Sequence, residues 1–268
     1  MQENKSGDLT KKKIQYYFII SHGLPFLMTA IFMILEGSVF VNQPFFNQMI
    51  YIAFSSPLIA AVFIIWLYYS KKEKKNYWIS IFDFSRIPWK MLLFILLFPV
   101  SIRFFAALIT GQLLMADFQF NLSPQMNIMY AITLLFFGPV PEELGWRGVA
   151  LPLLQDRFGF RKAAIFLGLM WAVWHLPLFF FRGTFQYQLG LFSPLFWNFM
   201  LAAFFTSIIL SVIFNETNNS ILAVILFHYM ENLTGQTFVI NTTAEITSNV
   251  IRGIIAIILF IYYGHKSR

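Results

Sequence analysis

Long apolar runs recur along almost the whole sequence, and they constrain the fold more than any other feature. A run of about 17 to 25 apolar residues is long enough to cross a bilayer as a helix, and such runs leave no stretch of this 268-residue chain for a separate soluble domain. The chain is 58% hydrophobic and 12% charged, against roughly 25% charged residues in soluble domains. We predict an all-α fold, a polytopic transmembrane helical bundle that forms a single membrane domain over residues 1–268.

Apolar windows predict about eight membrane-spanning helices. The polar opening from Met1 to Lys13 precedes an apolar run that is too long for the core of a signal peptide, so we expect no cleaved leader. The chain has no cysteine, which excludes disulfides and thiolate chemistry. The expected spans are 15–40, 49–69, 91–115, 126–147, 163–182, 194–214, 220–238 and 248–264.

Basic residues fall in alternate loops of this arrangement, as the positive-inside rule requires. One side of the membrane receives 15 of the 19 basic residues, namely Lys5, Lys11, Lys12, Lys13, Lys71, Lys72, Lys74, Lys75, Arg86, Lys90, Arg157, Arg161, Lys162, Lys266 and Arg268. The loops on the other side hold Arg182 and, at a span boundary, Arg252. We therefore expect both termini in the cytoplasm and a multi-pass protein of the plasma membrane. The net charge of +7 reflects this topology, so we expect the lipid bilayer and no nucleic acid as a partner.

Two adjacent glutamates and an arginine lie at the end of the fourth predicted span. A carboxylate in the bilayer costs on the order of 2.5 to 3.5 kcal/mol, so an intramembrane pair indicates a functional site. Glu143 and Arg147 are four residues apart and share a helix face, where they can form an ion pair. Glu142 points roughly 100° away from that face and remains available for chemistry. This segment alone equally allows the alternative that both glutamates only pair with arginines to hold helices together.

Two histidines inside other predicted spans favour the catalytic alternative. His175 belongs to the fifth span and His228 to the seventh, at depths that Glu142 can share. Asn232 follows His228 by four residues, so the two can offer hydrogen-bond donors to one point, as an oxyanion site requires. A single buried histidine is more often a core residue than a catalyst, but two at the depth of a glutamate and an asparagine favour a reactive site. Pro177 predicts a kink of the fifth helix beside His175.

In this combination the residues resemble the CPBP intramembrane proteases, a family that includes the CAAX prenyl endopeptidases and bacterial enzymes linked to bacteriocin processing and immunity. The core of the resemblance covers about 126–238. Trp171 stands where the family often has Phe, a difference that we expect to leave the chemistry unchanged. The three family motifs are matched in order by Glu142, Glu143 and Arg147 (Glu-Glu-x-x-x-Arg), by Trp171 and His175 (aromatic-x-x-x-His), and by His228 and Asn232 (His-x-x-x-Asn or Asp).

The resemblance implies an intramembrane endopeptidase that cleaves a peptide or membrane-anchored protein in a cytoplasm-facing cavity. Glu142 would act as general base on a water molecule, with His175 positioning or activating that water. His228 and Asn232 would stabilise the oxyanion, and Glu143 and Arg147 would support the geometry of the site.

The sequence allows more than one interpretation of the cofactor and of the class of protein. Glu142, His175 and His228 are a possible zinc ligand set, although the sequence lacks His-Glu-x-x-His. We favour a metal-independent reaction. The same side chains would also suit a proton relay in a proton-coupled carrier, and a non-catalytic immunity or scaffold protein would not need them.

Overall fold

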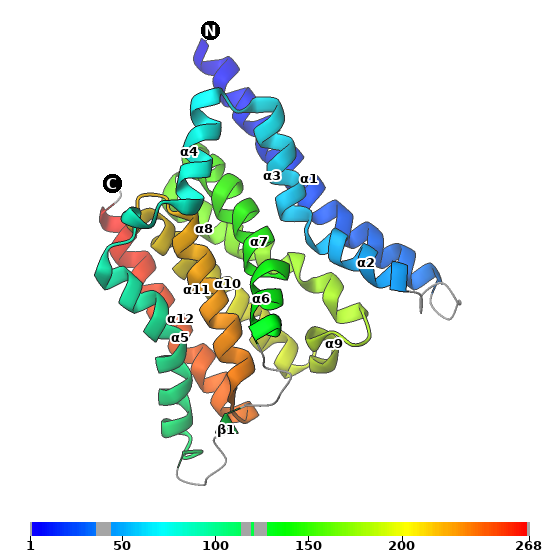
Figure 1. Cartoon of the computed structure of the whole chain (residues 1–268), viewed down its shortest axis with the longest axis vertical. Coiled ribbons are helices and arrows are strands. Elements are labelled where there is room, and N and C mark those ends of the chain that lie inside the picture. The colour runs from blue at the N-terminus through cyan, green and yellow to red at the C-terminus, as the bar shows by residue number, and fades with distance from the viewer. Residues whose placement is uncertain (1, 36–43, 114–118, 121–127, 267–268) are drawn as a thin grey trace. The chain divides into compact units, whose positions relative to one another are not determined.

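The computed structural model describes residues 2–35, 44–113, 119–120 and 128–266, and nearly all of them are helical (Figure 1). Two short strands, β1 (Gln119–Phe120) and β2 (Phe238–Val239), form an antiparallel pair with Gln119 opposite Val239. The predicted all-α class is confirmed. The helices are α1 (Gln2–Leu35), α2 (Pro44–Phe54), α3 (Ser56–Tyr68), α4 (Lys71–Phe82), α5 (Trp89–Ile109), α6 (Ile128–Phe137), α7 (Pro139–Gly145), α8 (Leu151–Trp174), α9 (Phe185–Leu189), α10 (Pro194–Glu216), α11 (Ile221–Thr237) and α12 (Thr242–Lys266), with 3₁₀ helices η1 (Phe84–Arg86) and η3 (Leu176–Phe180) and a π-helical turn η2 (Trp146–Ala150).

In the part of the chain that the structure describes, five helical segments are long and apolar enough to cross a membrane. They are Gly7–Leu35, Trp89–Ile109, Ile128–Phe180, Pro194–Glu216 and Thr242–Lys266, and the pair Gln48–Phe54 and Ser56–Tyr68, bent by 54°, gives a sixth if it counts as one span. Two predicted spans, 126–147 and 163–182, lie in the single segment Ile128–Phe180, and the predicted span 220–238 corresponds to the 17-residue α11. The predicted boundaries at 40, 115 and 126 lie outside the described residues. The chain is a multi-pass helical membrane protein, and the number eight stays approximate.

Glycine and proline divide the central segment differently from the prediction. The interruption predicted beside His175 is present, but as the end of a helix instead of a kink: α8 ends at Trp174 and the 3₁₀ helix η3 follows it. Proline has no N–H to continue the α-helical ladder, so the helix ends before it. Further upstream, Gly159 has φ 72° and interrupts α8 among the basic residues predicted to form a loop. A positive φ is a conformation that glycine adopts at little cost.

The chain folds into two compact units. Unit 1 comprises Met1–Lys75 and Pro141–Met200, and unit 2 comprises Asn76–Val140 and Leu201–Arg268. The expectation that residues 1–268 act as one membrane domain stays a prediction.

In unit 1 the long helix α1 packs against α3 and against α8 (Figure 1). Ala60 and Ala61 of α3 are fully buried, and small side chains of this kind let membrane helices approach closely. Leu154 and Leu167 of α8 are also completely buried. These helices form the framework on which the glutamate motif and His175 lie.

In unit 2 the helix α5 packs against both α11 and α12. The ring of Phe227 on α11 stacks on Phe94 of α5 with ring centroids 6.0 Å apart and contacts Phe98 at 5.9 Å. On α12, Gly253 leaves room for the ring of Phe205, since a Cβ at this glycine would lie 2.9 Å from that ring. Aromatic packing of this kind fixes how α11 is rotated about its axis.

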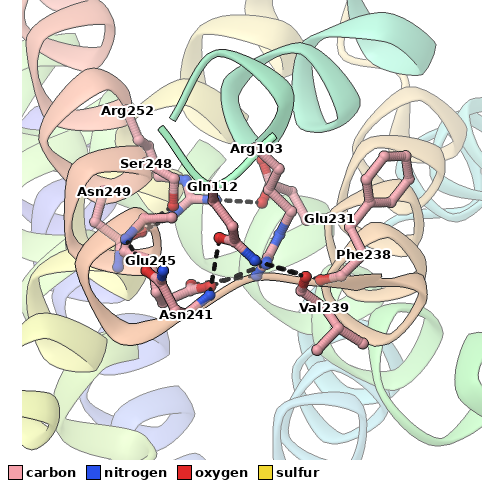
Figure 2. Close-up of polar contacts among 11 residues, drawn as sticks. Arg103, Gln112, Glu231, Phe238, Val239, Asn241, Glu245, Ser248, Asn249 and Arg252 are labelled. Carbon is pink, nitrogen blue, oxygen red and sulfur yellow. Dashed lines mark hydrogen bonds and ion pairs between the residues drawn. The ribbon is translucent and has the colours of Figure 1, made fainter. Parts of the chain in front are cut away.

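Polar contacts join the same three helices of unit 2 (Figure 2). Arg103 of α5 pairs with Glu245 of α12 at 2.9 Å, and Arg252 of α12 pairs with Glu231 of α11 at 2.6 Å. Arg252 also donates to Asn249. The Glu231 and Arg252 side chains are only 12% and 6% exposed, so each charge depends on the other for compensation.

Gln112 connects the end of α5 to the turn before α12. Its Nε2 donates to the carbonyl of Val239 at 3.3 Å, and its Oε1 accepts from the backbone N–H of Asn241 at 3.0 Å (Figure 2). These bonds satisfy backbone groups next to the β1–β2 pair, where the helical ladder is interrupted.

Removing one partner of the buried pair in unit 2 tests its contribution to stability. We expect Arg252→Met to lower the free energy of unfolding by about 3 to 5 kcal/mol, because it leaves the Glu231 carboxylate buried without its cation. The double variant Glu231→Met/Arg252→Met should recover much of that loss. Thermal unfolding of the purified protein in one detergent measures both effects.

The control is Lys266→Met, which breaks the more exposed pair between Lys266 and Glu216. This variant should unfold at the temperature of the wild type. An Arg252→Met protein as stable as Lys266→Met would contradict the proposed importance of the buried pair.

Candidate active site

The glutamate motif lies in a short helix that begins directly after an interruption of the backbone helix. Helix α6 ends at Phe137, Gly138 forms a turn, and α7 starts at Pro139. Proline suits a first helical position because the N–H that it lacks would have no partner inside the helix. The helix is therefore interrupted at Gly138, four residues before Glu142. After Gly145 the helix widens into the π-turn η2, a feature frequent at functional sites.

Glu143 and Arg147 form the predicted ion pair. The Nη1 atom of Arg147 lies 2.9 Å from Oε1 and 3.0 Å from Oε2 of Glu143, so both carboxylate oxygens accept from the guanidinium. Both side chains are completely buried in unit 1. Two charges this far from water require each other, because either one alone would have no compensation for its desolvation.

Glu142 lies outside that pair and has a different kind of donor. Its Oε2 accepts a hydrogen bond of 2.7 Å from the indole N–H of Trp171, which comes from α8. The guanidinium carbon of Arg147 lies 4.8 Å from the centre of the same indole ring, in a cation–π contact. Arg147 therefore lies near both glutamates: it is hydrogen-bonded to Glu143 and interacts electrostatically with Glu142, which in addition accepts from the indole of Trp171.

His175 lies directly after the end of α8, and a hydrogen bond to the backbone of that helix holds its ring. Its Nδ1 lies 2.7 Å from the backbone carbonyl oxygen of Trp171. A carbonyl can only accept, so Nδ1 carries the proton and, in the neutral ring, Nε2 carries the lone pair. The rings of Trp171, Trp174 and Phe199 surround the imidazole edge to face, at centroid distances of 5.2, 4.9 and 5.3 Å.

A second layer of side chains supports this end of α8. Trp174 donates its indole N–H to the hydroxyl of Ser56 at 3.1 Å, and Ser56 in turn donates to the carbonyl of Ser21 at 2.6 Å. The Nε2 atom of His22 lies 3.0 Å from the carbonyl oxygen of Met170. Trp146 is fully buried among the aromatic rings of unit 1. These contacts tie α1 and α3 to the turn that carries Trp171 and His175.

His228 and Asn232 lie on α11 in unit 2. Their four-residue spacing puts them on one face of this helix, and His228 is buried. The amide nitrogen of Asn232 is 3.4 Å from the position of a Cβ added at Gly138, which precedes Glu142 by four residues. Glu231, next to Asn232, pairs with Arg252, so the same turn of α11 is fixed to α12.

Unit 1 thus brings together Glu142, Glu143, Arg147 and His175, and unit 2 carries His228 and Asn232. Sequence reasoning missed the contact that links Glu142 to α8, the indole N–H of Trp171. The only signal for it was the choice of Trp as the aromatic residue of the second motif. It also missed the pairing of Glu231 with Arg252, since the two residues lie 21 positions apart on different helices.

A zinc ion at this site would need protein ligands grouped around one point. A catalytic zinc site takes three protein ligands and a water. Among the described residues of each unit, no three histidine, aspartate or glutamate side chains are grouped to hold a metal. Glu142 and His175 belong to unit 1 and His228 to unit 2, so the described residues of neither unit supply a full ligand set.

Comparisons with known proteins agree with the motif residues. A family model described as type II CAAX prenyl endopeptidase Rce1-like matches residues 124–234, a range that contains every residue of the three motifs. The chain is 27% identical over 214 residues to CAAX prenyl protease 2 of Methanococcus maripaludis, in a match that covers 77% of this chain and 78% of that protein. Over the range of its three motifs the chain is similar to the CAAX proteases. It is an intramembrane endopeptidase, and the CAAX-protease motifs lie on the helices described above.

The glycine that ends α7 tests how tightly the glutamate motif of this protease is packed. A Cβ at Gly145 would lie 2.4 Å from the carbonyl oxygen of Pro57 on α3. We expect Gly145→Ala to cost about 1 to 3 kcal/mol of stability, because the backbones of α7 and α3 would have to separate. The thermal midpoint of the purified protein measures this cost.

The matched control is Gly23→Ala in α1, where an added Cβ meets nothing within 4 Å. That change should leave stability unchanged or raise it slightly, since alanine favours helix. Equal thermal midpoints for the two variants would show that α3 does not pack on Gly145.

Proposed function

We propose that the chain hydrolyses peptide bonds with Glu142 as the general base. The observation that supports this most is the contact of Glu142 with Trp171, the residue whose carbonyl also accepts from His175. Glu143 is bound through both oxygens to the guanidinium of Arg147, whereas Glu142 accepts from the neutral N–H of Trp171. His175 Nδ1 donates to the backbone carbonyl of the same Trp171, so one residue of α8 holds both the carboxylate and the imidazole, the two groups that general-base catalysis on water would use here.

In the proposed reaction a water molecule gives a proton to Glu142 and its oxygen attacks the carbonyl carbon of the scissile bond. The lone pair on His175 Nε2 accepts the second hydrogen of that water and orients it. Negative charge develops on the carbonyl oxygen, and His228 and Asn232 donate hydrogen bonds to it. The tetrahedral intermediate then breaks its C–N bond, and the leaving nitrogen takes the proton from Glu142.

Glu143 and Arg147 support the geometry. The pair neutralises the buried guanidinium, whose contact with the Trp171 ring joins this helical turn to α8. Since a 1 Å misplacement of a reacting group can cost a factor of about 100 in rate, we assign this pair a supporting role outside the chemistry.

The substrate that we propose is a peptide or the tail of a membrane-anchored protein, cleaved in a cavity that opens to the cytoplasm. The alternation of basic loops supports this orientation, with both termini in the cytoplasm and the protein in the plasma membrane. The relative from Methanococcus maripaludis carries the name CAAX prenyl protease 2. Prenylated C-terminal tails are therefore the first peptides to test.

Glu142→Gln is the variant that tests the function without a guess at the substrate. It keeps the size of the side chain and its ability to accept from Trp171, but it removes the base. We expect peptide termini that depend on the wild type to disappear with this variant. Mass spectrometry of termini in membranes and medium, from cells that express each protein equally, makes the comparison.

The control is Glu216→Gln, which alters a surface pair at the end of α10 and should leave those termini intact. Wild-type termini that persist with Glu142→Gln would contradict the assignment. In that case, altered flux of a solute in Glu142→Ala would indicate a carrier, and an unchanged phenotype would indicate an immunity or scaffold protein.

We further propose that the reaction needs no metal, since the sequence lacks the His-Glu-x-x-His signature of many zinc proteases. Hydrolysis of a reporter peptide by the purified protein should keep its rate, within about twofold, after dialysis against a strong zinc chelator. A rate that is lost with the chelator and returns with zinc would overturn this proposal and make Glu142, His175 and His228 the ligands to test.

A further inference from the structure

Three parts of Trp171 contact three residues of the proposed site. Its indole N–H donates to Glu142, its ring face lies against the guanidinium of Arg147, and its backbone carbonyl accepts from His175. The side chain is 3% exposed, so water competes little for these contacts. A single residue of α8 therefore links the base, the supporting cation and the imidazole.

The N–H is the only one of these contacts that depends on indole chemistry. A phenylalanine at this position would keep a ring face for Arg147 and the same backbone carbonyl for His175, but it has no donor for Glu142. The bond is short, at 2.7 Å, and its acceptor is a carboxylate, so it belongs to the stronger class of hydrogen bonds. Burial strengthens it further, because a low local dielectric increases the electrostatic attraction.

We propose that Trp171 is a positioning residue for hydrolysis. Its N–H holds one oxygen of the Glu142 carboxylate and thereby orients the carboxylate toward the attacking water. This inference rests on the proposed function, in which Glu142 is the base. It differs from our expectation for the sequence, in which Trp171 was equivalent to Phe.

The hydrogen bond from Trp171 leaves the Glu142 carboxylate able to bind the attacking water. A carboxylate has two oxygens and about four lone-pair positions, so it can accept from Trp171 and from a water at the same time. A carboxylate fixed on one oxygen loses little orientational freedom when the water binds, and preorganised groups are more effective than mobile ones. The bond also favours the ionised form of Glu142, which is the form that can accept a proton.

A second tryptophan on the same helix gives a matched control. Trp174 is also buried, at 2% exposed, but it donates its N–H to Ser56. Trp171→Phe and Trp174→Phe therefore remove the same atoms from neighbouring turns of α8, and only the first removes a donor from Glu142. A structural effect of losing an indole should appear in both variants.

The experiment measures kcat and KM against pH for the wild type and the two variants, with a reporter peptide that the wild type cleaves. We expect Trp171→Phe to lower kcat at least about tenfold, the effect of losing a hydrogen bond to a charged group, with little change in KM. The acidic limb of its rate profile should move to higher pH by about one unit, because the ionised carboxylate loses its donor. Trp174→Phe should keep the acidic limb of the wild type.

Equal kcat values and equal acidic limbs for the two variants would overturn the positioning role. If Trp171→Phe does not fold, benzothienylalanine at position 171 keeps the shape of the indole and removes only its N–H, and the same shift is then expected. The variant Glu142→Gln separates the hypothesis that Glu142 is the base from the hypothesis that Trp171 positions it. Full activity of Glu142→Gln would refute the proposed base, whereas an inactive Glu142→Gln together with an unchanged Trp171→Phe would refute only the role of Trp171.

Discussion

The buried ion pair between Glu143 and Arg147 is the constraint around which unit 1 is organised. Both side chains are completely removed from solvent, and their contact uses both carboxylate oxygens. A charge in such surroundings costs several kcal/mol unless it is compensated, and because both side chains are buried, α7 and η2 are rotated with this face toward the interior of unit 1. That rotation directs Glu142 toward α8, where the indole N–H of Trp171 meets it. The aromatic rings around His175 complete this environment.

Unit 2 follows the same physical rule with different residues. The pairs Arg103–Glu245 and Glu231–Arg252 join α5, α11 and α12, and they set the turn of α11 that carries Asn232. In both units, therefore, a proposed reactive residue lies next to a charge that pairs structurally: Glu142 beside Glu143, and Asn232 beside Glu231. Stability and proposed chemistry are divided between neighbouring side chains, so that the structural charge is paired while its neighbour is available for the proposed reaction.

The sequence was sufficient for the features that depend on local spacing. The all-α membrane class followed from the length of the apolar runs, and the Glu143–Arg147 pair from a separation of four residues on one helix. The assignment of the site residues as a whole, including the roles of His228 and Asn232, stays a prediction.

Features that depend on packing between distant segments could not be read in this way. The Glu231–Arg252 contact joins two helices, so the spacing of residues within either helix does not predict it. Pro177 was expected to kink a continuous helix, but α8 ends at Trp174, because the following residues satisfy their backbone groups in a 3₁₀ helix. The sequence also did not predict the role of the Trp171 indole. An aromatic residue at that position can be explained by packing alone, and only the structure shows that its N–H donates to Glu142.

The account depends on Glu142 as the base that activates water, and the purified protein tests this most directly. The measurement is the rate of hydrolysis of one identified substrate peptide in water enriched in ¹⁸O, for the wild type and for Glu142→Gln at equal folded concentration. We expect the wild type to place a single ¹⁸O in the new carboxyl group, and Glu142→Gln to be slower by about 100- to 10,000-fold, the range of general-base contributions. Hydrolysis by Glu142→Gln within a few-fold of the wild type would contradict the account.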